Sequence, residues 1–196
     1  MNVEEARYKI NLARSERTGY VFKGIFSNTP SWDQIISQIN YGYNNGSSNM
    51  WKDDIEGYDD SKYSKYGEIF KNDVILYKDR NLFLSCGMDD ALEFYPEAEE
   101  PENFFKTALQ REDTGFSQLF VNFVANEDKM VMHVDQRETV FWLIKGKATW
   151  IIGDPEDWNK TTKFEIEAGD VIFVPYGLPH TVESNSPRAG LVLGIN

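Results

Sequence analysis

The second half of the chain alternates short apolar runs with turn residues. After Gly115 this pattern predicts eight strands, at residues 116–125, 130–135, 139–145, 147–152, 163–167, 171–175, 179–184 and 189–195. Short strands at such regular spacing, separated by glycine and proline, are typical of an all-β sandwich or barrel. We therefore expect a mainly β protein with a barrel at its core.

The first half has a mixed pattern. Apolar side chains at helical spacing predict a helix over residues 3–17, and a short strand is expected at residues 20–25. Ser31 followed by Gln34 is a capping-box pattern, which predicts a helix from there through Ile39. These elements predict a mixed helical and extended region before the barrel.

Three further segments lie between these two regions. Residues 41–49 have the composition of a loop. Apolar runs at residues 74–77 and 82–84 flank a polar tetrapeptide, which predicts a hairpin. Proline suits the first turn of a helix, so Pro101 predicts a helix from there through Leu109.

We divide the chain into two parts on these grounds. Residues 1–67 form a mixed α/β N-terminal extension packed on the barrel, and residues 68–196 form the barrel core. The tyrosine- and asparagine-rich stretch 41–66 is a candidate lid or substrate-selecting element, because long loops often carry function.

Composition and charge limit the function. The chain is 41% hydrophobic and 14% aromatic, which suffices for a packed core. Its 20 basic and 32 acidic residues give a net charge of −12. Such a surface repels phosphate backbones, so nucleic acid is an unfavourable partner, whereas a small molecule, protein or peptide substrate stays open.

The single cysteine, Cys86, rules out a disulfide within the chain and fits a reducing compartment. The first residues lack the apolar region of a signal peptide, and no apolar run reaches the length of a membrane span. We therefore expect a cytoplasmic protein that does not contact membranes.

The chain has two histidines, His133 and His180, and both are metal-ligand candidates. Side chains at positions i and i+2 of a strand share a face, so Asp135 should point the same way as His133. Two imidazoles and a carboxylate on one face of an octahedron suit non-haem Fe(II) and leave three positions open. Glu138 has the opposite parity and is not expected to be a ligand.

The spacing of Gly169, Pro175, Gly177 and His180 resembles the second conserved motif of the cupin superfamily. Cupins usually carry a histidine where Asp135 stands and a glutamate where Thr139 stands. The H-x-D arrangement here is more similar to the JmjC-like branch, and the likeness covers roughly residues 116–195.

This resemblance implies a cupin-like double-stranded β-helix, or jelly-roll barrel. It also implies an Fe(II)- and 2-oxoglutarate-dependent hydroxylase of unknown substrate, in which His133, Asp135 and His180 are the metal-binding and catalytic residues. Many barrels of this kind pair through N-terminal elements, which leaves a homodimer open.

The cosubstrate anchor departs from the family pattern. JmjC oxygenases of the asparaginyl-hydroxylase type hold the far carboxylate of 2-oxoglutarate with a lysine, and Ala148 stands at that position. Lys147 is adjacent but should face outward unless a bulge shifts the register. Arg188 is our preferred substitute, since its guanidinium suits a carboxylate. The Thr139 hydroxyl is a further candidate contact to the cosubstrate.

Two alternatives stay open. Ala148 favours a metal-dependent cupin that does not use 2-oxoglutarate, such as a small-molecule dioxygenase or isomerase. A ligand-binding cupin without turnover is the other alternative, and the intact H-x-D…H set argues against it.

Overall fold

The computed structural model describes residues 1–44, 48–52, 82–87, 94–122, 128–129 and 132–194. Its strands form two antiparallel sheets. The larger sheet has seven strands in the order β1-β10-β7-β12-β4-β3-β2, and the smaller has β5-β11-β8-β9, with β6 paired to β11. The bounds are β1 (Tyr20–Phe22), β2 (Ser48–Lys52), β3 (Leu82–Gly87), β4 (Gly115–Asn122), β5 (Asp128–Lys129), β6 (His133–Val134), β7 (Thr139–Lys145), β8 (Lys147–Gly153), β9 (Thr161–Glu167), β10 (Val171–Val174), β11 (Pro179–Ser184) and β12 (Arg188–Gly194).

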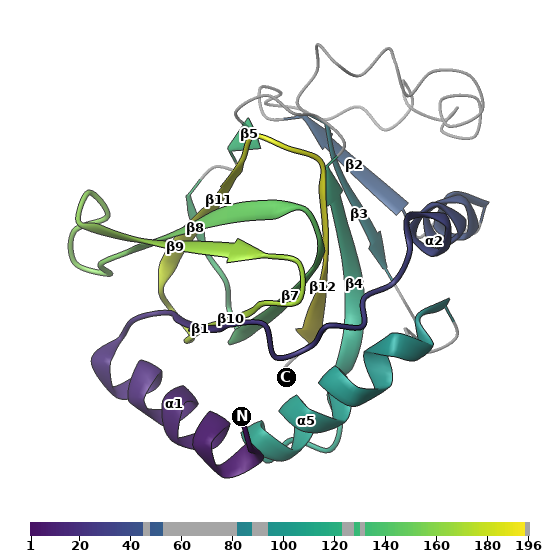
Figure 1. The fold of residues 1–196 in the computed structure, drawn as a ribbon. Coiled ribbons are helices and arrows are strands. Elements are labelled where there is room, and N and C mark those ends of the chain that lie inside the picture. The colour runs from purple at the N-terminus through teal and green to yellow at the C-terminus, as the bar shows by residue number, and fades with distance from the viewer. Residues whose placement is uncertain (45–47, 53–81, 88–93, 123–127, 130–131, 195–196) are drawn as a thin grey trace.

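The helices are α1 (Val3–Glu16), α2 (Trp32–Asn44) and α5 (Glu99–Leu109), the last preceded by a 3-10 turn, η3 (Pro96–Ala98). In Figure 1 the sheets curve around a common interior, α1 and α5 lie below the barrel, and α2 lies beside β3. The predicted capping box is confirmed: the Gln34 N–H donates to Ser31 Oγ at 3.2 Å, and the Ser31 N–H donates to Gln34 Oε1 at 2.7 Å.

Side-chain alternation along β7 divides the core into two layers. Trp142 and Ile144 face the helices, in a cluster that includes Ile10 of α1. Phe141 and Leu143 point into the space between the two sheets. Because both faces of β7 are covered, most of its side chains on either face are apolar. The predicted mainly β barrel with helices at its N-terminal side is therefore confirmed.

Two local predictions were wrong. α2 continues to Asn44, so the first part of the expected loop 41–49 is helical, and β2 begins at Ser48. The expected hairpin fails because residues 82–84 already pair with β2 at one edge and β4 at the other. Residues 74–77 and the division between residues 67 and 68 lie outside the described residues, as does most of the stretch 41–66.

Asp170 ties the N-terminal segment to the barrel. Its buried carboxylate accepts the N–H of Gly24 at 2.7 Å and the N–H of Glu167 at 2.9 Å. It also pairs with Lys23 Nζ at 2.8 Å. The strand β1 in turn pairs with β10, so the N-terminal part of the chain contributes a strand to the larger sheet.

Within the ranges that the structure describes, no helix is both long enough and apolar enough to cross a membrane.

Candidate metal centre

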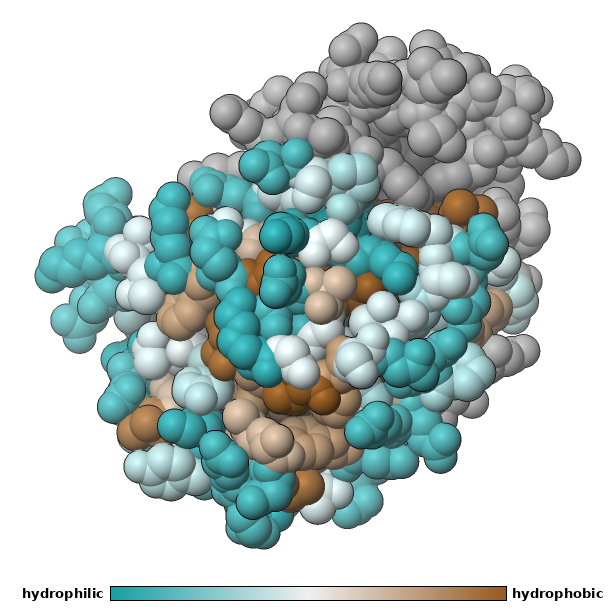
Figure 2. Space-filling view, in the orientation of Figure 1, coloured by the Kyte–Doolittle hydropathy of each residue, from teal (hydrophilic) through white to brown (hydrophobic). Residues whose placement is uncertain are grey.

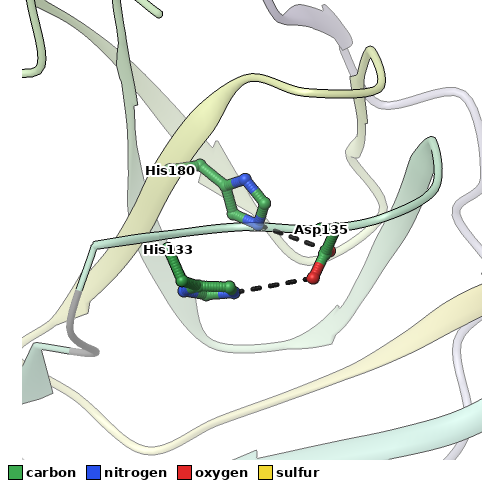
Figure 3. A group of neighbouring side chains, drawn as sticks. All are labelled: His133, Asp135 and His180. Carbon is green, nitrogen blue, oxygen red and sulfur yellow. Dashed lines mark ion pairs between the residues drawn. The ribbon is translucent and has the colours of Figure 1, made fainter.

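His133, Asp135 and His180 converge at one mouth of the barrel (Figure 3). One potential ligand atom from each residue lies within 4.8 Å of the others. His180 Nε2 is 3.5 Å from Asp135 Oδ2, and His133 Nε2 is 3.8 Å from Asp135 Oδ1. The structure thus brings together the three residues that the sequence singled out.

Strand pairing sets the separation of the two histidines. His133 in β6 lies directly opposite His180 in β11, so both side chains leave the sheet on the same face. Asp135 follows β6 two positions after His133 and returns to that face by alternation. The cluster is therefore held by the ladder of the smaller sheet rather than by a loop alone.

His180 has a defined orientation. Its ring is 3% exposed, and Nδ1 lies 2.9 Å from the carbonyl oxygen of Leu178. A carbonyl only accepts, so the proton must be on Nδ1 for this hydrogen bond, and Nε2 is the nitrogen that faces the cluster. Trp150 stacks on the ring at a centroid distance of 5.5 Å and limits its rotation. This is the arrangement that orients a metal-binding imidazole.

Asp135 is held as an anion. The Thr139 hydroxyl donates to its Oδ2 at 2.8 Å. Hydrogen bonding with His180 is the main cause that lowers the pKa of Asp135 to about 2. The Thr139 hydrogen bond and the charges of both histidines lower it further, while burial acts in the opposite direction. The Asp135 carboxylate and one nitrogen of each imidazole form a donor set that fits a divalent metal such as Fe(II).

Glu138 does not join the cluster. Its carboxylate accepts two hydrogen bonds from the Arg14 guanidinium, both at 2.6 Å, and so points toward α1. This is the direction that strand parity predicts.

The cluster opens on a cavity of about 120 Å³ between the two sheets. Apart from Ser117 of β4, the lining side chains share one parity along each strand, as expected for the inner surface of a barrel. They include the polar residues Ser117, Gln118 and Asn122, the cations Arg137 and Arg188, and the apolar residues Phe120, Phe141, Trp150, Val182 and Val192.

Arg188 is brought to this cavity. It begins β12, lies opposite the buried Asn122 of β4, and is only 4% exposed. The turn residue Gly146 is so close to Pro187 and Arg188 that a side chain there would overlap the Pro187 carbonyl oxygen. Ala148, two residues beyond this turn, is buried, so Arg188 and the expected lysine position flank the same turn.

Lys147 is not brought to the cavity. Its side chain is 74% exposed and lies 3.5 Å from Glu167, on the outer side of β8. The cause is regular alternation, since β8 pairs with β9 in continuous register through Lys147 and has no bulge that would turn the side chain inward. Thr139 does line the cavity, but its hydroxyl donates to Asp135.

Sequence reasoning missed four polar lining residues, Ser117, Gln118, Asn122 and Arg137. Gln118 and Asn122 could have been found by parity, because they alternate along β4 with the same period as Phe120. Arg137 has no such signal, since it belongs to the irregular segment between β6 and β7.

The fold and the cluster together define a cupin-type barrel with a candidate metal centre. Residues 119–195 match the family profile described as a cupin domain, so this part of the chain is similar to that family. A search of curated protein sequences finds no match for the chain.

Solved structures extend the similarity beyond this domain. A structure of YcfD, a ribosomal oxygenase from Escherichia coli, is 14% identical with a TM-score of 0.60, over 94% of this chain and 50% of that chain. The same E. coli protein in complex with cobalt and succinic acid is 16% identical with a TM-score of 0.58, over 96% and 51%. The chain thus spans about half the length of these structures. The expected likeness to JmjC-like oxygenases is confirmed for the fold.

Proposed function

We propose that the protein is an Fe(II)- and 2-oxoglutarate-dependent oxygenase that hydroxylates its substrate. One observation carries this proposal: the cavity that contains the His133, Asp135 and His180 cluster also contains the buried guanidinium of Arg188. A metal ligand set and a cation in one cavity suit a dicarboxylate that binds the metal at one end and the cation at the other. The E. coli structure with cobalt and succinic acid supports the pairing of metal and dicarboxylate in this fold.

The charge of the cavity also supports the proposal. Arg137 and Arg188 line it together with two histidines, and among the lining residues that the structure describes Asp135 is the one carboxylate. The protein as a whole has a net charge of −12, so a local excess of positive groups is a specific feature of this cavity. It favours an anionic cosubstrate over a neutral one.

The residues of the site have separate roles in this proposal. His133, His180 and Asp135 hold the metal, which supplies the oxidising chemistry with O₂ and 2-oxoglutarate. Thr139 fixes the Asp135 carboxylate by its hydrogen bond, as the Leu178 carbonyl fixes the tautomer of His180. Apolar side chains of the cavity, Phe141, Val182 and Val192 among them, limit the entry of water.

Arg188 holds the far carboxylate in this proposal. In asparaginyl hydroxylases a lysine binds this carboxylate from the position that corresponds to Ala148 in β8. In this protein Arg188 would bind it from β12 instead. The proximity of the Gly146 turn to Arg188 supports this exchange, because the two positions lie on either side of that turn. Lys147 is excluded from this part by its outward direction.

A metal-dependent cupin that does not use 2-oxoglutarate is the second candidate. The small side chain of Ala148, where the family lysine would stand, favours it. The candidates differ in one property, namely whether 2-oxoglutarate binds next to the metal.

The test is to add Fe(II) and then 2-oxoglutarate without oxygen, and to record the weak visible charge-transfer band of the chelate. We expect the band with the unmodified protein and with Lys147→Ala, and its loss with His180→Ala. Metal binding without the band would favour the second candidate. Absence of metal binding would favour a cupin without turnover.

A further inference from the structure

We propose that the substrate is a polypeptide segment with acidic side chains, and that it binds in a cationic groove next to the metal centre. The proposal rests on the proposed oxygenase function, whose substrate class it names. We call the groove formed by Arg14, Leu109, Arg111, Arg137, Glu138 and Tyr176 the arginine groove.

The arginine groove adjoins the metal cavity. Arg137 lines both spaces. Arg137 and Glu138 of the groove follow Asp135 of the metal cluster in the same segment. They lie two and three positions after it along the chain. A ligand in the groove therefore lies beside the opening through which a side chain would reach the metal.

The charge of the groove indicates an anionic ligand. Glu138 already neutralises Arg14 through two hydrogen bonds at 2.6 Å. No ion pair or hydrogen bond within the described ranges engages the guanidinium of Arg111 or Arg137. Two exposed and unpaired arginines thus remain on this face of a protein with a net charge of −12. Arginine binds carboxylates through two parallel hydrogen bonds, so each can hold an acidic side chain.

The fold holds Arg111 and Arg14 in defined positions. Arg111 follows α5, and its N–H donates to the carbonyl of Lys106 at 2.9 Å, while Thr114 Oγ1 donates to the Arg111 carbonyl at 3.1 Å. Arg14 lies in the last turn of α1 and stacks over Phe173 at 5.6 Å. The groove is therefore built by three segments that the fold holds together.

Size distinguishes a polymer from a small molecule. The metal cavity is about 120 Å³, whereas the arginine groove is about 800 Å³ and open to solvent. A small substrate would need only the smaller cavity, but an extended chain needs an open channel beside it. Tyr176, with 66% exposure, adds an aromatic surface against which a peptide backbone can pack.

A polypeptide fits better than a nucleic acid. Nucleic-acid binding relies on many cations along a regular backbone, whereas the groove has two unpaired arginines. A longer phosphate chain would also be repelled by the net charge of −12 on the protein as a whole. An acidic peptide can place its few charges at the two arginines and keep neutral residues elsewhere.

The test measures binding of three fluorescein-labelled probes to the Fe(II)-loaded protein without oxygen, by fluorescence anisotropy. The probes are a twelve-residue peptide of Glu, Gly and Ser, the same peptide with Lys in place of Glu, and a single-stranded RNA of twelve nucleotides. We expect the Glu peptide alone to bind, and more weakly as salt rises. Tighter binding of the Lys peptide or the RNA, or no binding of the Glu peptide, would overturn the proposal.

Charge reversal locates the site. Arg111→Glu and Arg137→Glu should each weaken binding of the Glu peptide at least about tenfold, because a like charge then faces the ligand. Lys160→Glu is the matched control, since it changes the charge equally in the turn between β8 and β9, which projects from the barrel (Figure 1). If all three variants weakened binding equally, the net charge of the protein would explain the binding, and the proposal of a peptide site in the arginine groove would be wrong.

Arg111→Glu also separates the two proposals. It touches neither the metal cluster nor the metal cavity, so the 2-oxoglutarate charge-transfer band should be unchanged while peptide binding is lost. If Arg111→Glu kept both a normal band and full peptide binding, the peptide site in the arginine groove would be refuted and the oxygenase function would stand. Peptide binding without any band in the unmodified protein overturns the oxygenase function and leaves the groove as a peptide site.

Discussion

His133 and His180 face each other across the β6 and β11 pair, with ring centroids 4.5 Å apart. The backbone ladder sets this distance before any metal arrives, so the positions of the two imidazoles do not depend on ordering a flexible loop. Figure 2 shows a hollow with apolar side chains inside it on the front face of the barrel, rimmed by polar side chains. The preset arrangement of His133 and His180 lowers the free-energy cost of ordering them when a metal binds.

Replacing either histidine by alanine is expected to abolish stoichiometric Fe(II) binding. Each provides one of three ligand atoms, and loss of a direct ligand should exceed the roughly 10- to 100-fold loss that follows from changing an outer partner. Metal content after anaerobic loading and desalting measures this. Full metal content in the His133→Ala/His180→Ala double variant would falsify the site.

Glu138→Gln is expected to keep full metal content. The carboxylate points to Arg14 and not to the cluster, so its change should cost only the ion pair, about 1 kcal/mol of stability or less for a partly exposed pair. Urea unfolding of the metal-free protein measures the loss of stability. A loss of metal equal to that of His180→Ala would show that Glu138 is a ligand after all.

Arg188→Ala is expected to weaken 2-oxoglutarate binding far more than Lys147→Ala does. A lost guanidinium–carboxylate pair in a buried site costs on the order of 2–5 kcal/mol, or tens- to thousands-fold in affinity. Anaerobic titration with Fe(II) present gives both affinities.

Arg188 is buried, so metal content and thermal unfolding are needed to show that the Arg188→Ala variant still folds. Affinities equal to that of the unmodified protein in both variants would remove Arg188 from the site.

Gly190→Ala is expected to destabilise the barrel by about 1–3 kcal/mol. Gly190 lies between Arg188 and Val192 on the inner face of β12, and a methyl group there would overlap the Phe141 ring. The additional change Phe141→Leu should recover part of the loss, because it removes the atoms that clash. Additive effects of the two changes in chemical unfolding would contradict this packing relationship.

Most strands of the barrel could be predicted because their signal is local. The run 139–145 is apolar from Val140 to Ile144 and is followed by the turn residue Gly146, and the structure has β7 at those residues. The same holds for the capping box at Ser31 and for the i, i+2 relation of His133 and Asp135. Each depends on side-chain direction within a few residues, which the sequence specifies directly.

Predictions failed where distant segments compete for the same partner. Residues 82–84 were expected to pair with a run a few positions before them, but β2 and β4 occupy both edges of β3. Pairing over such distances depends on the packing of the whole sheet, for which a turn-like tetrapeptide is no guide. The position of Arg137 on two adjoining cavities has the same cause, since it depends on where α1 and α5 pack.

The pair of Arg14 and Glu138 spans 124 residues and joins α1 to the segment that begins with Asp135. Metal that orders this segment must also favour the docked position of α1, and by thermodynamic reciprocity a docked α1 raises metal affinity by the same factor. The first helix is therefore energetically part of the metal site, although it provides no ligand. Shortening the chain from its amino end would weaken metal binding while leaving all three ligands in place.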